Sequence, residues 1–404
     1  MLCGLLVIVA VLAACAPPPP DAGFSQPPGG LERFRPGDVI RVRPWTFSQA
    51  PLTRNPVAGV RTLQVLYRST DALGRPDAVT GTVLLPEAPW RGPGRRPLVS
   101  YAVGTHGLGD DCAPSRLFAQ GIDYESGIVG ELLAQGWAVA VTDMEGLGTP
   151  GVHTYNVGRS AGPAVLDMAR AALRVPEAGL PADTPIGIMG YSQGGGSAAW
   201  AAALAPTYAP ELRLAGVAAG GVPADPAAIA RADDGGAWVG LVLLTSLGFD
   251  AAYPELHLDS YLNERGRSMT ATSKDLCVES VAGIATLIGV AGTHTRDYVT
   301  SVSPLDAPAW QARLAENRLG REVPTAPILM QHGLFDTTVP FAQAQQLRSE
   351  WCAAGAKVTW QIRPLAEHVL GYVQTWGPAI AFLSDRFAGR PAPGNCADPF
   401  PIAW

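Results

Sequence analysis

A serine between two glycines stands where a predicted strand meets a predicted helix. Ser192 lies in Gly190-Tyr191-Ser192-Gln193-Gly194, which has the G-x-S-x-G form of a nucleophile elbow. Residues 185–189 are apolar and of strand length, and residues 197–204 are strong helix formers. Glycines suit such a corner because it needs unusual backbone angles and leaves no space for side chains. We therefore interpret Ser192 as a nucleophile; the alternative is an inert serine at a glycine-rich helix start.

A serine hydroxyl needs a histidine to accept its proton and a carboxylate to orient the imidazole. Where a nucleophile elbow is used, these partners follow in the order serine, acid, histidine. His368 lies in a loop after the last strand-like run, residues 358–362, and Asp336 lies in a turn after residues 326–331. We predict a catalytic triad of Ser192, Asp336 and His368, the alternative for His368 being an ordinary surface-loop histidine. Other candidates for the acid are Asp306 and Asp143.

The oxygen of a tetrahedral intermediate needs two hydrogen-bond donors that are in place before the reaction. The backbone N–H of Gln193, directly after the nucleophile, is one predicted donor. The second is expected from the backbone between Thr105 and Gly107, in the loop after strand 98–103. His106 is our candidate in this loop, and its two neighbours remain alternatives.

The elements around these residues predict an α/β fold with a mostly parallel sheet and helices on both faces, because continuous apolar strands alternate with helices. Such sheets carry their active sites at the carboxyl ends of the strands, so the loops of the three triad residues should meet there. The predicted strands are residues 61–67, 78–85, 98–103, 137–142, 185–189, 214–219, 326–331 and 358–362, the first two forming a hairpin. The predicted helices are residues 128–135, 163–173, 197–204, 342–353 and 372–387.

Between about residues 223 and 321 the alternation stops, which predicts a helical insertion. Residues 238–249 and 281–290 are apolar helical segments that are too short to span a membrane. Their apolar faces form either the insertion's own small core or a lid that contacts lipid.

The amino-terminal residues indicate export. Residues 2–14 are almost wholly apolar and too few for a stable membrane anchor, which predicts a signal peptide over residues 1–15. Leu12-Ala13-Ala14-Cys15 resembles a bacterial lipobox, so we expect an extracellular protein or one tethered to the cell envelope through lipidated Cys15. Residues 16–37 are rich in Pro and Gly and predict a tether or a surface strap, followed by one domain over residues 38–404.

Composition excludes other classes of function. The formal net charge of −6 gives no broad basic field, so no nucleic acid partner is expected. Neither a CxxC pair nor an HExxH motif occurs, and we expect no metal or other cofactor. In an oxidising compartment the four cysteines after the leader should form disulfides, with three pairings open: Cys112, Cys277, Cys352 and Cys396.

Taken together, these features resemble the secretory lipase family of fungi and actinobacteria, over about residues 37–399. The resemblance implies an α/β-hydrolase fold, a helical lid between residues 223 and 321, and the triad already proposed. It implies an acyl-serine intermediate, ester or lipid substrates, and disulfides Cys112 to Cys277 and Cys352 to Cys396. A yeast member has an acidic side chain where this chain has His106, so a backbone donor is favoured there. The segments that carry the resemblance are residues 111–115, 142–146, 190–194, 209–212, 220–223, 351–356 and 366–368.

Two other functions are compatible with this sequence. The same triad could transfer the acyl group to an alcohol other than water, as in a cell-envelope acyltransferase, which product analysis with added acceptors would reveal. A non-catalytic surface protein with the hydrolase fold is the second alternative, because fold does not imply function. It predicts a broken triad, whereas all three residue types are present here.

Overall fold

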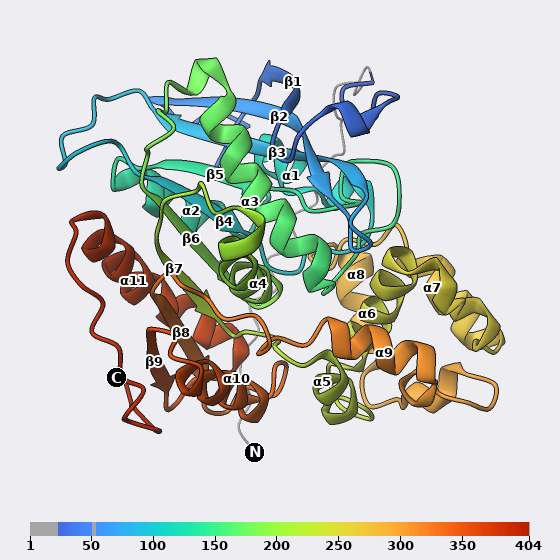
Figure 1. Cartoon of the computed structure of the whole chain (residues 1–404). Coiled ribbons are helices and arrows are strands. Elements are labelled where there is room, and N and C mark those ends of the chain that lie inside the picture. Colours follow the sequence, from blue (N-terminus) through green and yellow to red (C-terminus); the bar gives the residue numbers. More distant parts are fainter. Residues whose placement is uncertain (1–22, 51–53, 404) are drawn as a thin grey trace.

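The computed structural model describes residues 23–50 and 54–403, so the predicted signal peptide, Cys15 and the first part of the Pro-rich stretch lie outside the described residues. Within the described residues, nine strands form one sheet in the order β1-β2-β3-β5-β4-β6-β7-β8-β9 (Figure 1). The strands are β1 (Val39–Pro44), β2 (Val60–Thr70), β3 (Pro76–Pro86), β4 (Leu98–Ala102), β5 (Ala138–Thr142), β6 (Ile186–Tyr191), β7 (Leu214–Gly220), β8 (Ile328–Gly333) and β9 (Val358–Arg363).

The sheet has an antiparallel part and a parallel part. Strands β1, β2 and β3 are antiparallel neighbours, and β3 pairs antiparallel with β5. From β5 through β4 and β6 to β9 all neighbouring strands are parallel. The predicted α/β class with a mostly parallel sheet is therefore confirmed, and β2 and β3 form the predicted hairpin.

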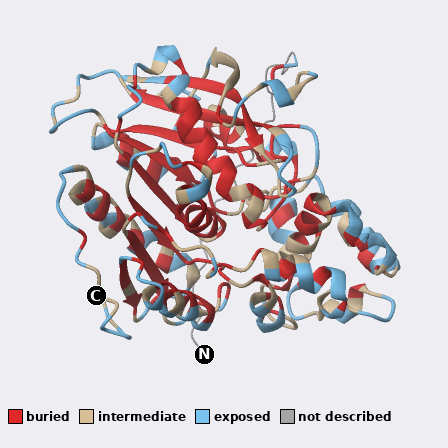
Figure 2. Ribbon diagram, viewed as in Figure 1, coloured by how far each residue is buried: buried red, intermediate tan, exposed pale blue. Residues whose placement is uncertain are grey.

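Helices cover both faces of the sheet, whose strands are buried between them (Figure 2). On one face Trp200 and Leu347 pack with Ile188 in a continuous apolar core. On the other face Ile128 and Leu383 pack in a second core. The helices of the first face are α3 (Gly158–Arg174), α4 (Gln193–Tyr208) and α10 (Phe341–Ala353), and those of the second face are α1 (Pro114–Gln120), α2 (Ser126–Ala134) and α11 (His368–Phe387).

Five further helices stand between β7 and β8 and form the insertion, olive to orange in Figure 1. Its two apolar helices differ in role: Leu247 and Phe249 of α6 are buried in the insertion's own core, whereas α8 exposes Val281 (82%), Ile284 (49%) and Ile288 (70%). In the described chain no single helix is long and apolar enough to cross a membrane; α6 and the short helices after it qualify only as a pair, bent by 114°. The insertion helices are α5 (Pro226–Ala232), α6 (Val239–Ala252), α7 (Glu264–Ser273), α8 (Val281–Val290) and α9 (Pro308–Glu316).

Two disulfides join the described cysteines in the pairs that the resemblance implies. Cys112 to Cys277 connects the start of α1 with the insertion, across 165 residues. Cys352 to Cys396 connects α10 with the chain after α11, across 44 residues.

One chain segment packs on the antiparallel part of the sheet, and another covers the β9 edge. Phe24, which precedes β1, packs on Leu66 of β2 and Ala78 of β3. At the β9 side, the backbone of residues 395–403 runs along the strand: Ile362 N–H donates to Pro401 O (3.0 Å), and Ala403 N–H donates to Ile362 O (2.8 Å). Outward-facing backbone groups of β9 therefore find partners within the molecule.

Candidate active site

Ser192 occupies the sharp turn between β6 and α4. Its backbone φ is 59°, a left-handed value that is rare for a residue with a side chain. A Cβ at Gly190 would collide with Gly194 O, and one at Gly194 would collide with Ala102 O. The two flanking glycines therefore allow the close approach that holds Ser192 at the corner.

The structure brings Ser192, His368 and Asp336 together at the carboxyl ends of β6, β8 and β9. His368 Nε2 lies 2.8 Å from Ser192 Oγ. His368 Nδ1 lies 2.7 Å from Asp336 Oδ2. In this arrangement Nδ1–H donates to the carboxylate, which leaves Nε2 free to accept the serine proton.

Asp336 is held as an oriented carboxylate. Its Oδ1 accepts hydrogen bonds from the backbone N–H groups of Thr338 (3.0 Å) and Val339 (2.8 Å). Burial acts to raise the pKa of Asp336, but the hydrogen bond and charge of His368, helped by His332 and Val339, hold this pKa below its usual value. Asp336 is therefore ionised near neutral pH.

The two rival acids lie in other environments. Asp143 is buried and accepts hydrogen bonds from the N–H (2.8 Å) and the hydroxyl (2.5 Å) of Ser115. Asp306 is exposed in a short helix of the insertion. Of the three carboxylates considered, Asp336 is the one hydrogen-bonded to His368.

His368 is the first residue of α11, whereas the sequence predicted a loop there and a helix from residue 372. The helix begins early because the Glu367 carboxylate accepts from Val369 N–H (3.0 Å) and Leu370 N–H (2.6 Å) and so caps it. The Tyr191 hydroxyl donates to His368 O (2.7 Å), which ties the histidine to the strand that carries Ser192.

The loop after β4 is fixed by buried charges. His106 Nε2 lies 3.0 Å from Asp123 Oδ2, and Nδ1 lies 3.0 Å from Gly104 O. Burial alone would lower the pKa of His106, but Asp123 outweighs it and raises this pKa to about 10, so the ring is cationic. Gly104 N–H donates to Glu125 Oε2 (2.8 Å). Both ring N–H groups of His106 are thus engaged inside the loop, and only its backbone is left as a donor toward Ser192.

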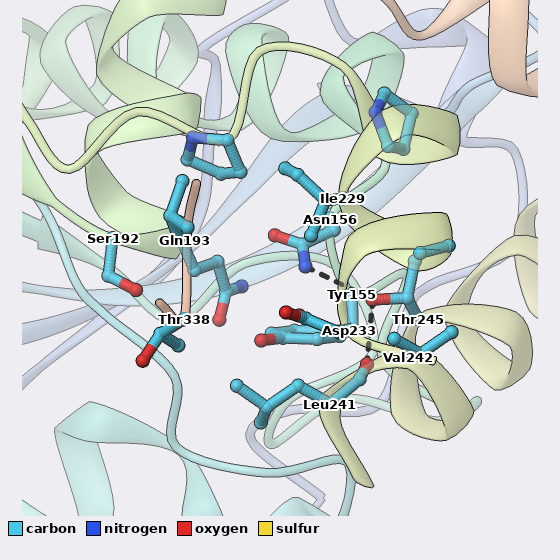
Figure 3. Close-up of a pocket in the computed structure, with 14 residues that line it drawn as sticks. Tyr155, Asn156, Ser192, Gln193, Ile229, Asp233, Leu241, Val242, Thr245 and Thr338 are labelled. Atoms are coloured by element: carbon cyan, nitrogen blue, oxygen red, sulfur yellow. Dashed lines mark hydrogen bonds between the residues drawn. The ribbon is translucent and has the colours of Figure 1, made fainter. Parts of the chain in front are cut away.

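Two cavities meet at Ser192. One extends under α5 and α6 and includes Gln193 and Asp233 in its wall (Figure 3). The other is lined by His368, by Thr105 and by α8 and α11 residues. Asp233 was not predicted as a site residue, because it joins the site only when the insertion folds over the sheet. In the described chain no group of three or more His, Cys, Asp or Glu side chains is placed to hold a metal ion.

Comparison with known proteins places these features in a family. The model of the family described as secretory lipase matches residues 113–395. A Mycobacterium tuberculosis protein named a probable inactive lipase is 31% identical over 387 residues, covering 92% of this chain and 83% of the relative. A secreted triacylglycerol lipase of Malassezia furfur is 28% identical over 398 residues, covering 93% of this chain and 81% of the relative.

Solved structures agree with the fold. Candida antarctica lipase A in its closed state superposes with a TM-score of 0.84 at 25% identity, covering 94% of this chain and 88% of that one. The rice cell wall degrading esterase LipA of Xanthomonas oryzae gives a TM-score of 0.70 at 19% identity, covering 88% of this chain and 100% of that one, which shows the shared fold. The sheet, the family match and the related lipases lead to one conclusion: this chain belongs to the secretory lipase family and has the α/β-hydrolase fold.

Proposed function

We propose that this protein hydrolyses carboxylic esters through an acyl-serine intermediate, with Ser192 as nucleophile, His368 as base and Asp336 as the orienting carboxylate. The observation that supports this is the continuous chain from Ser192 Oγ to His368 Nε2 (2.8 Å) and from His368 Nδ1 to Asp336 Oδ2 (2.7 Å). His368 takes the serine proton as Oγ attacks the acyl carbon, then returns it to the leaving alcohol. A water molecule, deprotonated in the same way, releases the acid from the serine.

Backbone N–H groups are proposed to stabilise the tetrahedral oxyanion. Gln193 N–H stands at the start of α4, where helix N–H groups are free and the helix dipole favours negative charge. Across the site, the N–H groups of Thr105 and His106 donate no hydrogen bond within the described chain, whereas Gly104 N–H is already engaged. The cationic His106 ring is proposed to hold this loop in place rather than to donate to the substrate.

Covalent labelling tests the proposed nucleophile directly. An alkyl p-nitrophenyl phosphonate should label the purified protein once per molecule, on the peptide that contains Ser192, with a matching release of p-nitrophenol. Absence of labelling together with absence of ester turnover would favour a non-catalytic role. That role has support in the M. tuberculosis relative, which is named a probable inactive lipase.

The insertion is proposed to act as a lid that contacts lipid. Val281, Ile284 and Ile288 lie on one exposed face of α8, and Leu365 (70%) and Val369 (61%) are exposed near His368. The His368-lined cavity has α8 and α11 residues in its wall, so this apolar surface borders the entrance. Export accords with the secretory family, while lipidation of Cys15 stays a prediction.

Replacing Val281, Ile284 and Ile288 together by serine should reduce hydrolysis of an emulsified long-chain triacylglycerol about tenfold or more. Each buried aliphatic side chain contributes roughly 1.5 to 3 kcal/mol to transfer from water, and partial burial at a lipid surface would give a fraction of that. Turnover of a soluble acetate ester should stay near the wild-type value, because the site itself is unchanged. Equal losses on both substrates would argue against a lipid-contact role for α8.

A further inference from the structure

Two residues that line the cavity beside Ser192 each carry a buried hydrogen-bonding atom without a partner in the described chain. The atoms are Gln193 Oε1 and Asp233 Oδ2, and each residue is only 4% exposed. Figure 3 shows the two side chains turned toward each other in the cavity wall. Buried polar atoms normally have partners, so this pair points to a polar group on a ligand.

The orientation of the Gln193 amide is fixed by His153. His153 Nδ1 lies 2.7 Å from Glu145 O, which can only accept, so Nδ1 carries the proton. Burial lowers the pKa of His153 to about 4, so its ring is neutral near pH 7 and Nε2 is an acceptor. The Gln193 amide nitrogen, 2.7 Å from that Nε2, must therefore be the donor. Gln193 Oε1 is thus an acceptor, and no donor in the described chain bonds to it.

Asp233 can pair with a hydroxyl in either of its protonation states. It follows the last residue of α5 and lines the cavity from the insertion side. Burial, with the nearby charge of Asp336, raises the pKa of Asp233 to about 7, while a charge on His368 acts in the opposite direction. A carboxylate accepts from a hydroxyl, and a carboxylic acid donates to one. Leucine or valine at this position would offer neither.

The position of His368 indicates which part of an ester enters this cavity. His368 must protonate the leaving alcohol, and it lines the other cavity, with Tyr372 and Val369. His368 does not line the cavity that contains Gln193 and Asp233. This cavity therefore lies away from the leaving alcohol, and we assign it to the acyl part of the ester. Four of its residues, Pro226, Ala230, Val242 and Thr245, also line a third cavity deeper in the insertion. The walls of that cavity include Phe249, Leu258 and Trp310.

We propose that this site selects acyl groups that carry a hydroxyl one or two carbons from the ester carbonyl, with Asp233 as the specificity-determining residue and Gln193 as its partner. The inference rests on the proposed ester hydrolysis and deepens it by naming the acyl class. A longer alkyl tail beyond the hydroxyl would reach the apolar cavity under α6. The hydroxyl is bound and not consumed, so the reaction remains ester hydrolysis.

The test compares p-nitrophenyl esters of butanoate, 2-hydroxybutanoate and 3-hydroxybutanoate. Each kcat/KM is divided by the rate constant for hydrolysis of the same ester by hydroxide, which removes the intrinsic reactivity of the hydroxylated esters. The wild-type protein should prefer one hydroxylated ester at least tenfold over butanoate. Asp233→Leu should abolish that preference, so that its normalised rates for the three esters become equal.

Two matched variants complete the design. Asp259→Asn removes a carboxylate from the exposed side of the same insertion and should keep the preference. Asp233→Asn keeps the shape of the side chain and one hydrogen-bonding oxygen. This variant should keep part of the preference for the hydroxylated ester. Phosphonate labelling of Ser192 in every variant reports a folded, competent site independently of acyl preference.

Equal normalised rates for the three esters in the wild-type protein would overturn the inference, as would a preference that survives in Asp233→Leu. The wild-type ratios decide alone if the leucine variant is not recovered folded. Active butanoate hydrolysis without a hydroxyl preference leaves the proposed function intact and removes only this inference. Absence of turnover on all three esters, with no labelling, removes the proposed function and the inference with it.

Discussion

Ser192→Ala is expected to lower kcat for a soluble ester by roughly 10⁶-fold, the scale seen when the nucleophile of a serine triad is removed. Alanine keeps the Cβ, so the backbone at φ 59° carries the same strain in both proteins and the fold should be retained. The variant loses only Oγ, the atom that His368 Nε2 approaches to 2.8 Å. Steady-state kinetics with p-nitrophenyl acetate, together with a thermal unfolding curve, provide the measurement.

Ser197→Ala is the matched control for that experiment. Ser197 is a buried serine one turn further along α4, and its hydroxyl donates to Gln193 O (2.9 Å) within the helix. Alanine is the best helix former, so this variant should fold and retain activity. Wild-type turnover in Ser192→Ala would remove the nucleophile assignment, and equal losses in both variants would point to damage of α4 instead.

Removing the Cys112 to Cys277 disulfide by a double alanine replacement should cost about 5 kcal/mol of unfolding free energy, because it frees a very long loop in the unfolded chain. For a chain of this size that corresponds to a fall in Tm of about 6 °C. The kcat/KM for a soluble ester should fall as well. The disulfide joins the insertion to the stretch after His106, whose carbonyl accepts from Val278 N–H (3.0 Å) beside Cys277. Calorimetry and kcat/KM for a soluble ester give the two measurements.

The second disulfide supplies the comparison. A double alanine replacement of Cys352 and Cys396 opens a loop across 44 residues, with an expected cost of about 4 kcal/mol. It joins α10 to the carboxyl-terminal segment, away from the loop after β4, so kcat/KM should stay near wild type. A matching loss of activity in both double variants would contradict a specific role of the Cys112 to Cys277 disulfide in holding the loop after β4.

The sequence was sufficient to predict the central sheet and the convergence of the triad residues. Both depend on local signals: apolar runs predict the strands, and Asp336 and His368 directly follow two of them. Because parallel strands end at one edge of a sheet, residues that follow those strands meet there. Strand β1 (Val39–Pro44) was missed although apolar and charged residues alternate in it, a pattern that favours an edge strand.

Helix starts were harder to predict, because capping depends on side-chain geometry. The sequence predicted a helix that begins at Pro163. In the structure α3 begins at Gly158, so Pro163 lies inside the helix. The first turn of α3 packs so closely against Trp200 that a Cβ at Gly158 would collide with the Trp200 ring. Likewise, glutamate is not among the preferred capping residues, and nothing local indicated that Glu367 would cap α11 so that the helix begins at His368.

The polar groups of the cavities could not be predicted from local patterns. Asp233, Gln193 and His153 lie far apart in the chain and meet only when the insertion and the loop after β5 close over α4. The same holds for His106 and Asp123, whose pairing requires the loops before and after α1 to pack together. Such contacts depend on the complete tertiary structure.

The carboxyl-terminal segment along β9 bears on how this protein behaves at high concentration. A bare edge strand exposes a row of N–H and C=O groups on which another copy can add a strand, the first step toward aggregates. Here residues 395–403 occupy that position, anchored by Arg348, whose guanidinium donates to the carbonyl oxygens of Asn395 (3.1 Å), Cys396 (2.7 Å) and Asp398 (2.6 Å). The backbone groups at the β9 edge are thereby unavailable to a strand of another copy, which suits an exported protein beyond the reach of cytoplasmic chaperones.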